Sequence, residues 1–245
     1  MTNPQVALIT GSSRGIGLGI ACELARKNYS IALNAPFLDE ELEAAMAKVQ
    51  KLGVPVIAAA FDVTDIDQHT ECLSNIESQL GPLTTLVNNA GVSVLQRGDL
   101  LTVSPESFDR CMNVNAKAVF FLSQAFSKKI LSRELNPDIF HSLINVTSSN
   151  AVAAATLRSE YCASKAAAAM ISKTLAVRLG SEGIHVYDVQ PGLINTDMTA
   201  GVIREYEKKC TNLKSKPLFN TTQKFKRESG EKGLSLTSLN NAIDF

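Results

Sequence analysis

Tyr161 and Lys165 stand four residues apart, a spacing that could support acid–base chemistry if both lie on one helix. On a helix, residues at this spacing share a face, about one turn apart. An ammonium beside a phenol favours the phenolate, so Lys165 should lower the pKa of Tyr161 from its usual value of about 10. Such a tyrosine can give a proton to a carbonyl oxygen or take one from an alcohol. The pair alone is also typical of an ordinary helix surface.

A glycine-rich turn near the amino terminus supports the chemical interpretation. Residues 6–10 are an apolar run of strand length, and an apolar helical pattern follows the turn. Glycines let the backbone approach a pyrophosphate, and the following helix supplies amide donors and a positive dipole end. The turn therefore predicts a dinucleotide-binding loop, although its spacing is GxxxGxG, and such a loop alone is more often a plain turn. Its candidate cofactor-binding residues are Gly11, Ser13, Arg14, Gly15, Ile16 and Gly17.

Several motifs occur together along the chain in a fixed order. They are Thr10-Gly11-xxx-Gly15-Ile16-Gly17, Asn88-Asn89-Ala90-Gly91, Ser148, Tyr161-xxx-Lys165 and Pro191-Gly192. In order and approximate distance they resemble the short-chain dehydrogenase/reductase family, most of all its beta-ketoacyl reductase-type members, over about residues 4–200. The resemblance implies a Rossmann-fold oxidoreductase that transfers a hydride between a nicotinamide cofactor and a carbonyl or secondary-alcohol substrate.

The resemblance also implies a catalytic set. Tyr161 would be the general acid or base, and Lys165 would also hydrogen-bond the nicotinamide ribose. Ser148 would polarise the substrate carbonyl. Its neighbour Ser149 competes for that role, but Tyr161 follows Ser148 by thirteen positions, which is the family's spacing. Asn115 would hold, inside a helix, a water that relays protons to the lysine. The alternative for Asn115 is an exposed asparagine.

Further cofactor contacts are implied at the ends of other predicted strands. Asp62, followed by Val63, would accept a hydrogen bond from the adenine amino group, although an aspartate after a strand is also a common helix cap. The segment after residue 88 would border the adenosine ribose, and the segment after residue 190 would contact the nicotinamide. The residues in these two segments are Asn89, Ala90, Gly91, Pro191, Gly192, Ile194 and Thr196.

Cofactor choice depends on the end of the second predicted strand. An acidic residue there binds the ribose hydroxyl of NAD and repels the 2′-phosphate of NADP. This chain has Asn34-Ala35-Pro36 and no acid before Asp39, while Arg14 in the glycine loop could pair with the phosphate. We therefore expect NADP(H) to be favoured over NAD(H). The alternative is that Arg14 is solvated or pairs within the protein.

Strand and helix patterns alternate along the chain, which predicts a parallel sheet with helices on both faces. Right-handed crossovers then favour a doubly wound α/β fold with strand order 3-2-1-4-5-6. The predicted strands are 6–10, 31–34, 54–61, 85–88, 143–147 and 184–189. The predicted helices are 15–27, 39–51, 67–79 and 105–133, with another that starts near residue 159.

Residues 1–200 are expected to form one dinucleotide-binding and catalytic domain. Residues 201–245 form a divergent basic tail of poor periodicity, in which no seventh strand of the family type is recognisable and disorder is one outcome. Substrate specificity should reside in the 92–104 loop and in this tail. If the tail fails to complete a substrate pocket, the alternative function is a cofactor-binding protein without turnover.

Composition limits the partners. The formal net charge is zero, which argues against nucleic acid, and no apolar run reaches the length of a membrane span. The five cysteines and three histidines show no metal-ligand spacing, so no metal is expected, and unpaired thiols indicate a cytoplasmic location. By resemblance we expect a homodimer through helices 105–133 and 161–180. Small residues that would permit close approach are Ala163, Ala166, Ala167 and Ala169.

Overall fold

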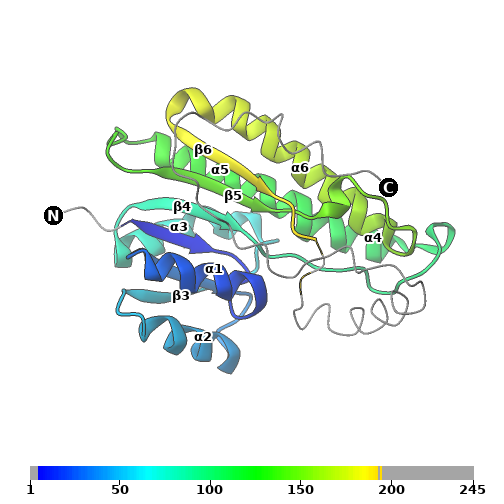
Figure 1. Ribbon diagram of the computed structural model, residues 1–245, viewed down its shortest axis with the longest axis horizontal. Coiled ribbons are helices and arrows are strands. Elements are labelled where there is room, and N and C mark those ends of the chain that lie inside the picture. The colour runs from blue at the N-terminus through cyan, green and yellow to red at the C-terminus, as the bar shows by residue number, and fades with distance from the viewer. Residues whose placement is uncertain (1–4, 193, 195–245) are drawn as a thin grey trace, which may run out of the picture. The chain divides into compact units, whose positions relative to one another are not determined.

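The structure is a computed structural model that describes residues 5–192 and residue 194. In this part of the chain, six strands form one sheet in the order β3-β2-β1-β4-β5-β6, and every neighbouring pair is parallel (Figure 1). This confirms the predicted order. The strands are β1 (Val6–Ile9), β2 (Ser30–Ala35), β3 (Val56–Ala60), β4 (Leu83–Asn88), β5 (His141–Val146) and β6 (Ile184–Val189).

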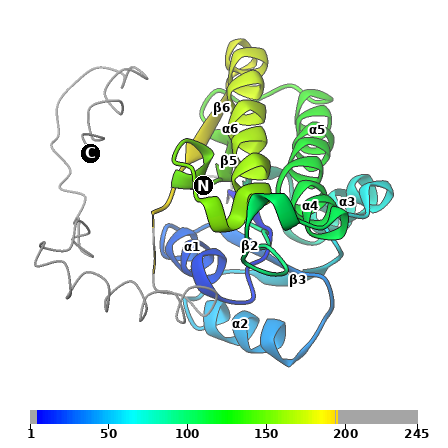
Figure 2. The same cartoon turned by 90° about the vertical axis from the view of Figure 1, so that its right-hand side faces the viewer.

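Helices cover both faces of the sheet, with α1 and α2 on one face and α3, α5 and α6 on the other (Figure 2). The α-helices are α1 (Gly15–Arg26), α2 (Glu40–Gln50), α3 (His69–Leu80), α4 (Pro105–Met112), α5 (Ala118–Leu131) and α6 (Ser159–Leu179). Short helical turns join some of them. These are η1 (Ile66–Gln68), η2 (Leu100–Thr102), η3 (Asn113–Lys117), η4 (Ser149–Ala151), η5 (Thr156–Arg158) and η6 (Gly180–Glu182).

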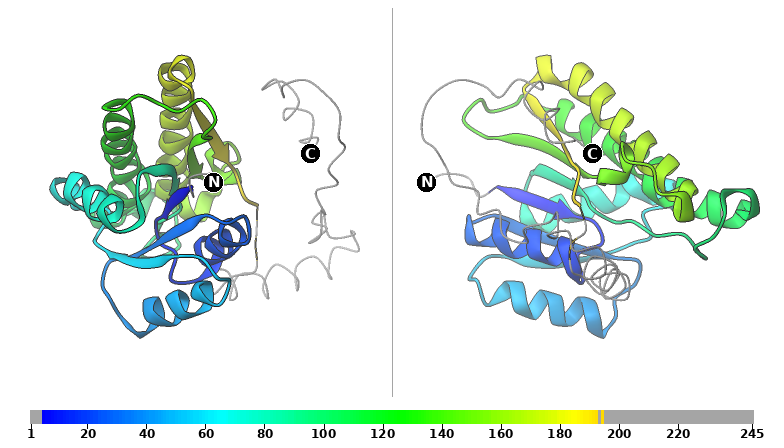
Figure 3. Two further views of the ribbon diagram at one scale, coloured as in Figure 1. Left: turned by 90° about the vertical axis from the view of Figure 1, so that its left-hand side faces the viewer. Right: turned by 45° about the vertical axis from the view of Figure 1, so that its right-hand side comes forward.

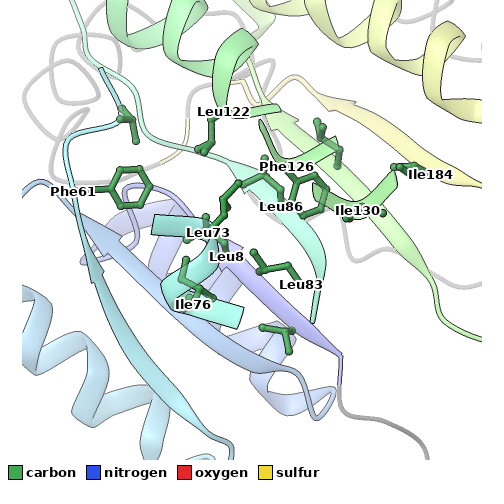
Figure 4. Packing of buried hydrophobic residues seen from close by; sticks show 14 of the residues in the cluster. Leu8, Phe61, Leu73, Ile76, Leu83, Leu86, Leu122, Phe126, Ile130 and Ile184 are labelled. Atoms are coloured by element: carbon green, nitrogen blue, oxygen red, sulfur yellow. The ribbon is translucent and has the colours of Figure 1, made fainter. Parts of the chain in front are cut away.

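The central strand β1 is a continuous apolar run, buried on both sides, because helices cover both faces of the sheet there. In β1, Val6 and Leu8 point into the core beneath α3 and α5, whereas Ala7 and Ile9 point into the core beneath α1 and α2. Figure 4 shows the first core, in which Phe126 of α5 packs among leucine and isoleucine side chains. The labelled members are Leu8, Phe61, Leu73, Ile76, Leu83, Leu86, Leu122, Phe126, Ile130 and Ile184.

The single helix expected over 105–133 is interrupted, and that expectation is wrong in this respect. Pro105 occupies the first turn of α4, and the Ser104 hydroxyl accepts a hydrogen bond from the Ser107 amide at its start. The chain then widens into one π-helical turn, η3, before α5 continues. Such widened turns often occur at functional sites, and η3 contains Asn115.

The carboxyl ends of parallel strands lie at one edge of a sheet, so segments that follow different strands meet there. Gly11 follows β1, Asn89 follows β4 and Ser148 follows β5. Helix α6 packs along β6, and its amino end lies at this same edge of the sheet (Figure 3). The expected boundary at residue 200, the missing seventh strand and the basic tail all lie outside the residues that the structure describes.

Candidate active site

In the glycine loop, at the edge of the sheet, several main-chain positions carry no side chain. Gly11 and Gly15 have φ angles of +59° and +57°, in the left-handed region that favours glycine. Gly17 is crowded instead: a β-carbon there would lie 2.3 Å from the Gly11 oxygen and 2.5 Å from Asn89 Nδ2. No side chain fits at that distance, so the loop has its shape only with glycine at position 17.

Asn89 fastens this loop to the end of β4. Its Nδ2 donates hydrogen bonds to the main-chain oxygens of Thr10, at 2.9 Å, and Gly11, at 2.8 Å. The Thr10 hydroxyl accepts from the amides of Asn89 and Ala90, both at 3.0 Å. The predicted segments after β1 and β4 therefore lie side by side, and the hydrogen bonds of Asn89 fix the distance between them.

Arg14 pairs within the protein, the alternative that the sequence left open. Its Nη1 lies 3.3 Å from Oε2 of Glu41 in the first turn of α2. The Ser13 hydroxyl donates to the other oxygen of the same carboxylate. Glu41 thus joins two predicted cofactor residues, and sequence reasoning missed it because it follows the strand end by several residues. Both partners are exposed, at 67% for the arginine side chain and 44% for the glutamate.

Asp62 and Val63 form a local turn after β3. Asp62 Oδ1 accepts hydrogen bonds from the Thr64 amide and the Thr64 hydroxyl, both at 2.8 Å. Val63 is 9% exposed and belongs to the core under α3. The contact between Asp62 and adenine remains a prediction.

Tyr161 and Lys165 both lie in the first half of α6, as predicted. The Lys165 ammonium nitrogen is 5.9 Å from the centre of the Tyr161 ring, and it donates a hydrogen bond to the Val146 oxygen at 3.0 Å. Lys165 is only 5% exposed. The helix therefore holds the ammonium between the tyrosine and the end of β5.

The expected lowering of the Tyr161 pKa by Lys165 is wrong. Burial raises the pKa of Tyr161 above its usual value, and the hydrogen bond from Ser148 and the charge of Arg158 only partly oppose this. Burial also lowers the pKa of Lys165 to about 8, and the negative charge of Asp188 opposes this only in part. Loss of hydration dominates in both groups because each charged form is costly away from water.

Ser148 and Ser149 have different surroundings. Ser148 is 8% exposed, its hydroxyl accepts from the Asn150 amide at 3.1 Å, and it hydrogen-bonds the Tyr161 phenol. Ser149 is exposed, and its amide donates to the Pro191 oxygen at 3.0 Å. The structure therefore brings Ser148, the serine preferred from its spacing, to the tyrosine.

Asn115 is fully buried, so the reading as an exposed asparagine is wrong. Its Oδ1 accepts from the Val92 amide at 2.8 Å, and its Nδ2 donates to the Val92 oxygen and the Ser164 hydroxyl, both at 3.0 Å. A β-carbon at Gly91 would lie 3.2 Å from this Oδ1 and 3.5 Å from Lys165 Nζ. Asn115 thus joins the segment after β4 to α6 next to the lysine, and its proton-relay role remains a prediction.

Two charged residues at this site were missed in the sequence. Arg158 places its guanidinium carbon 5.4 Å from the centre of the Tyr161 ring. Asp188 of β6 accepts hydrogen bonds from the Thr147 hydroxyl, at 2.5 Å, and from Gln190 Nε2, at 2.7 Å. Strand alternation could have identified Asp188, since it follows Ile184 by four residues and therefore shares the face that packs against α6.

The last predicted segment begins beside Ser149. The Pro191 oxygen accepts the hydrogen bond from that serine, and Gly192 and Ile194 follow, the latter 44% exposed. Their contact with the nicotinamide remains a prediction. Thr196 lies outside the described residues.

Residues 5–192 and 194 contain no group of three or more His, Cys, Asp or Glu side chains that could hold a metal ion. None of their helices has the length and hydropathy to cross a membrane. Cys22, Cys72, Cys111 and Cys162 are all free thiols. A cytoplasmic location remains a prediction.

Comparisons with known proteins agree with this geometry. Residues 5–207 match the family model described as short chain dehydrogenase. The chain is 33% identical to the gluconate 5-dehydrogenase of Gluconobacter oxydans over 201 residues, which cover 82% of this chain and 75% of that one. It is 33% identical to a Staphylococcus aureus 3-oxoacyl-[acyl-carrier-protein] reductase over 199 residues, which cover 81% and 78%.

Two similar solved structures carry different nicotinamide cofactors. One is a 3-oxoacyl-[acyl-carrier protein] reductase from Brucella melitensis in complex with NAD, with a TM-score of 0.81 and 35% identity over 86% of this chain and 82% of that one. The other is a gluconate 5-dehydrogenase from Burkholderia cenocepacia in complex with NADP and tartrate. Its TM-score is 0.73, with 29% identity over 81% of this chain and 75% of that one.

Proposed function

Since the chain belongs to the short-chain dehydrogenase family of NAD(P)-dependent oxidoreductases, we propose that it reduces a small carbonyl compound, or oxidises the matching alcohol, with Tyr161 as proton donor and acceptor. One observation carries this proposal. Ser148 hydrogen-bonds the Tyr161 phenol while Lys165 lies one helical turn away, at the strand edge that also holds the glycine loop.

The residues around the loop fit a dinucleotide. A β-carbon at Gly11 would lie 2.8 Å from the Ala90 α-carbon, and one at Gly17 would be still closer to its neighbours, so the loop takes this tight shape, as a pyrophosphate-binding loop would, only with glycine at both positions. Gly11, Ser13, Gly15 and Gly17 would hold the pyrophosphate, and Lys165 would hold the nicotinamide ribose. The bound nicotinamide would supply or accept the hydride.

The proton chemistry belongs to the chain's own side chains. Ser148 would donate a hydrogen bond to the substrate carbonyl and increase its polarity. Tyr161 would hold a proton at its phenol oxygen and give it to the same carbonyl oxygen during reduction. Because burial raises the pKa of Tyr161, the phenol stays protonated at neutral pH, which is the form that reduction needs. Asn115, next to Lys165, would help to return a proton from water.

NADP(H) is the proposed preferred cofactor. No acidic side chain follows β2 before Asp39, and Arg14 in the loop could bind the 2′-phosphate. To do so it would have to exchange Glu41 for the phosphate, since the two side chains form an ion pair. Such an exposed pair is weak, so a doubly charged phosphate could replace it.

An assay of NADPH oxidation with a panel of ketones tests the proposal. The wild-type chain should turn over at least one ketone. Tyr161→Phe should lose about 10²–10⁴-fold in turnover while it still binds NADPH, because the phenol moves the proton and does not touch the pyrophosphate. Wild-type turnover in this variant would refute the role of Tyr161. If wild type binds NADPH tightly but reduces no ketone, the chain is instead a cofactor-binding protein without turnover.

We also propose that the protein is a homodimer through the outer faces of α4, α5 and α6. Apolar side chains are exposed there, and a groove of about 440 Å³ between α4 and α6 is lined by Val103, Phe108 and Ala163 among others. The exposed apolar residues are Phe108, Phe120, Met170 and Val177. Ala163 and Ala166 are exposed as the dimer requires, but Ala169 is only 6% exposed and packs within its own chain, so its predicted part in close approach is wrong.

Sedimentation at micromolar concentration tests the dimer. The wild-type chain should sediment as a dimer, and Met170→Glu, which places a charge on the exposed face of α6, should shift it to a monomer. Glu182→Gln, a charge change near the far end of the same helix, should leave the dimer intact. A wild-type monomer would contradict this arrangement.

A further inference from the structure

Arg158 is a cation at the active site, and within the described part of the chain it has no acidic partner. It ends η5, directly before α6, and its guanidinium carbon lies 5.4 Å from the centre of the Tyr161 ring. The residue is half-buried. Within residues 5–192 and 194, no aspartate or glutamate forms an ion pair with it. A half-buried guanidinium beside a buried phenol, with no carboxylate on it in the described residues, is therefore placed to bind an anionic ligand.

The carboxylates closest to Arg158 along the chain and in the neighbouring loop are engaged elsewhere. Glu160 is 3% exposed, and its Oε1 accepts from the Ser107 hydroxyl of α4 at 2.6 Å. Asp99 accepts from the Leu101 amide at 2.9 Å and caps η2. Neither residue neutralises Arg158, so the positive charge beside Tyr161 is retained.

The loop predicted to set specificity meets η5 next to this arginine. The Gly98 amide donates to the Leu157 oxygen at 3.3 Å, which holds the loop against the residue before Arg158. Arg110 of α4 donates to the Ser93 oxygen at 2.8 Å and fixes the beginning of the loop. A substrate between this loop and Tyr161 would have Arg158 at its side.

We propose that Arg158 binds a carboxylate of the substrate, so that the substrate is a keto acid or the matching hydroxy acid. This inference rests on the proposed oxidoreductase function. A guanidinium presents paired donors that match the two oxygens of a carboxylate. With the carboxylate on Arg158, the carbonyl of the same molecule lies within reach of Ser148 and Tyr161, and hydride and proton transfer proceed there as proposed above.

A different role for Arg158 makes a different prediction. Its charge also favours the ionised phenol of Tyr161, and an effect through the tyrosine would change the reduction of every ketone alike. A keto acid and its own methyl ester separate the two roles, because they share the carbonyl and differ in charge. The probes are 4-oxopentanoate and methyl 4-oxopentanoate, with 3-oxobutanoate and its methyl ester as a shorter pair.

Kinetics with NADPH provide the first measurement. Wild type should reduce the better keto acid with a kcat/KM about ten- to a hundredfold above that of its ester, as expected for a charge-assisted contact. Arg158→Gln should abolish the preference for the acid, mainly by raising KM for the acid, and should leave kcat/KM for the ester within about threefold of wild type. Arg158→Lys should keep part of the preference. Lys48→Gln, an equal change of net charge on α2, should change kcat/KM for neither compound.

Calorimetry on the wild-type chain loaded with NADP⁺ provides the second measurement, which needs no turnover. The keto acid should bind more tightly than its ester, and Arg158→Gln should abolish the difference. Equal binding of acid and ester to wild type would overturn the inference, as would an equal loss for both compounds in Arg158→Gln. Absence of NADPH binding or of any ketone reduction would instead contradict the proposed function.

Discussion

The ammonium nitrogen of Lys165 donates a hydrogen bond to the main-chain oxygen of Val146, 3.0 Å away, and so joins α6 to the end of β5. The same nitrogen lies 5.9 Å from the centre of the Tyr161 ring. One side chain thus positions the helix that carries the tyrosine and carries a charge although it is only 5% exposed. Burial lowers its pKa to about 8, so this charge changes within an accessible pH range.

The affinity for NADH should therefore depend on pH through Lys165. Below a pKa of about 8 the lysine is an ammonium that can donate to the nicotinamide ribose, and above it the neutral amine is a weaker donor. Affinity should be constant at lower pH and fall by up to about tenfold for each pH unit above the pKa. NADH is preferred for this titration because it lacks the 2′-phosphate, which itself ionises near pH 6 by about one charge.

Two variants test the assignment by fluorescence titration of NADH. Lys165→Met should bind weakly at every pH and lose the dependence. Asp188→Asn should move the midpoint to lower pH, since the charge of Asp188 raises the pKa of Lys165 and its loss leaves the burial effect less opposed. A wild-type affinity that stays flat across the alkaline range would contradict a role for the ammonium in binding.

Gly17→Ala should abolish nucleotide binding and lower the melting temperature. The new β-carbon would lie 2.3 Å from the Gly11 oxygen and 2.5 Å from Asn89 Nδ2, and both belong to structure that cannot move freely. Such overpacking costs about 1–3 kcal/mol in the free energy of unfolding.

Gly19→Ala is the matched control on the same helix. No atom lies within 4 Å of a β-carbon at that position, so the change should stabilise α1 by about 0.5–1 kcal/mol and leave NADPH binding intact. Thermal unfolding and NADPH titration of both variants provide the comparison. If Gly17→Ala binds NADPH like wild type, the described loop geometry is wrong.

The fold could be predicted from the sequence because its signals are local. Strand patterns alternate with helical patterns along the chain, and β6 has the predicted bounds, 184–189. Right-handed crossovers then leave few strand orders, and the 3-2-1-4-5-6 order is confirmed. The catalytic candidates follow strands or lie on helices, so the topology itself brings Ser148 to Tyr161.

What could not be predicted depends on distances between segments that are remote in sequence. The ion pair of Arg14 with Glu41 forms across the gap between α1 and α2, and the π-helical turn around Asn115 has no local signal. The pKa of Tyr161 was predicted in the wrong direction for a related reason. Spacing identified the lysine as a neighbour but could not show that burial outweighs its charge.

Asn115→Ala should destabilise the fold by about 1–3 kcal/mol, because it removes the hydrogen bonds of Asn115 to the Val92 amide, the Val92 oxygen and the Ser164 hydroxyl. Asn113→Ala, an exposed position in the same π-helical turn, should change stability by less than about 0.5 kcal/mol. Urea unfolding measures both. An equal loss in the two variants would show that the turn itself, and not the bridge to Val92 and Ser164, is responsible.

Glu41→Gln should increase the affinity for NADPH and leave the affinity for NADH unchanged. The carboxylate of Glu41 holds Arg14 and Ser13, and it would stand close to the 2′-phosphate if Arg14 binds that group. Removing it frees the guanidinium and removes a like charge. Because exposed ion pairs contribute little and salt screens them, we expect a gain of about two- to fivefold, which is largest at low ionic strength.

Three further variants make the test of Glu41 specific. Glu40→Gln, which removes a neighbouring charge from the same first turn of α2, should have no effect, since Glu40 forms no ion pair in the described residues. Arg14→Ala should reduce the preference for NADPH by about one to two orders of magnitude, the value of a charge-assisted hydrogen bond. In the Arg14→Ala background, Glu41→Gln should lose most of its effect, because the two residues act through one pair. If Glu41→Gln instead lowers the affinity for NADH, the carboxylate of Glu41 binds the ribose hydroxyl, and the proposed NADP(H) preference is wrong.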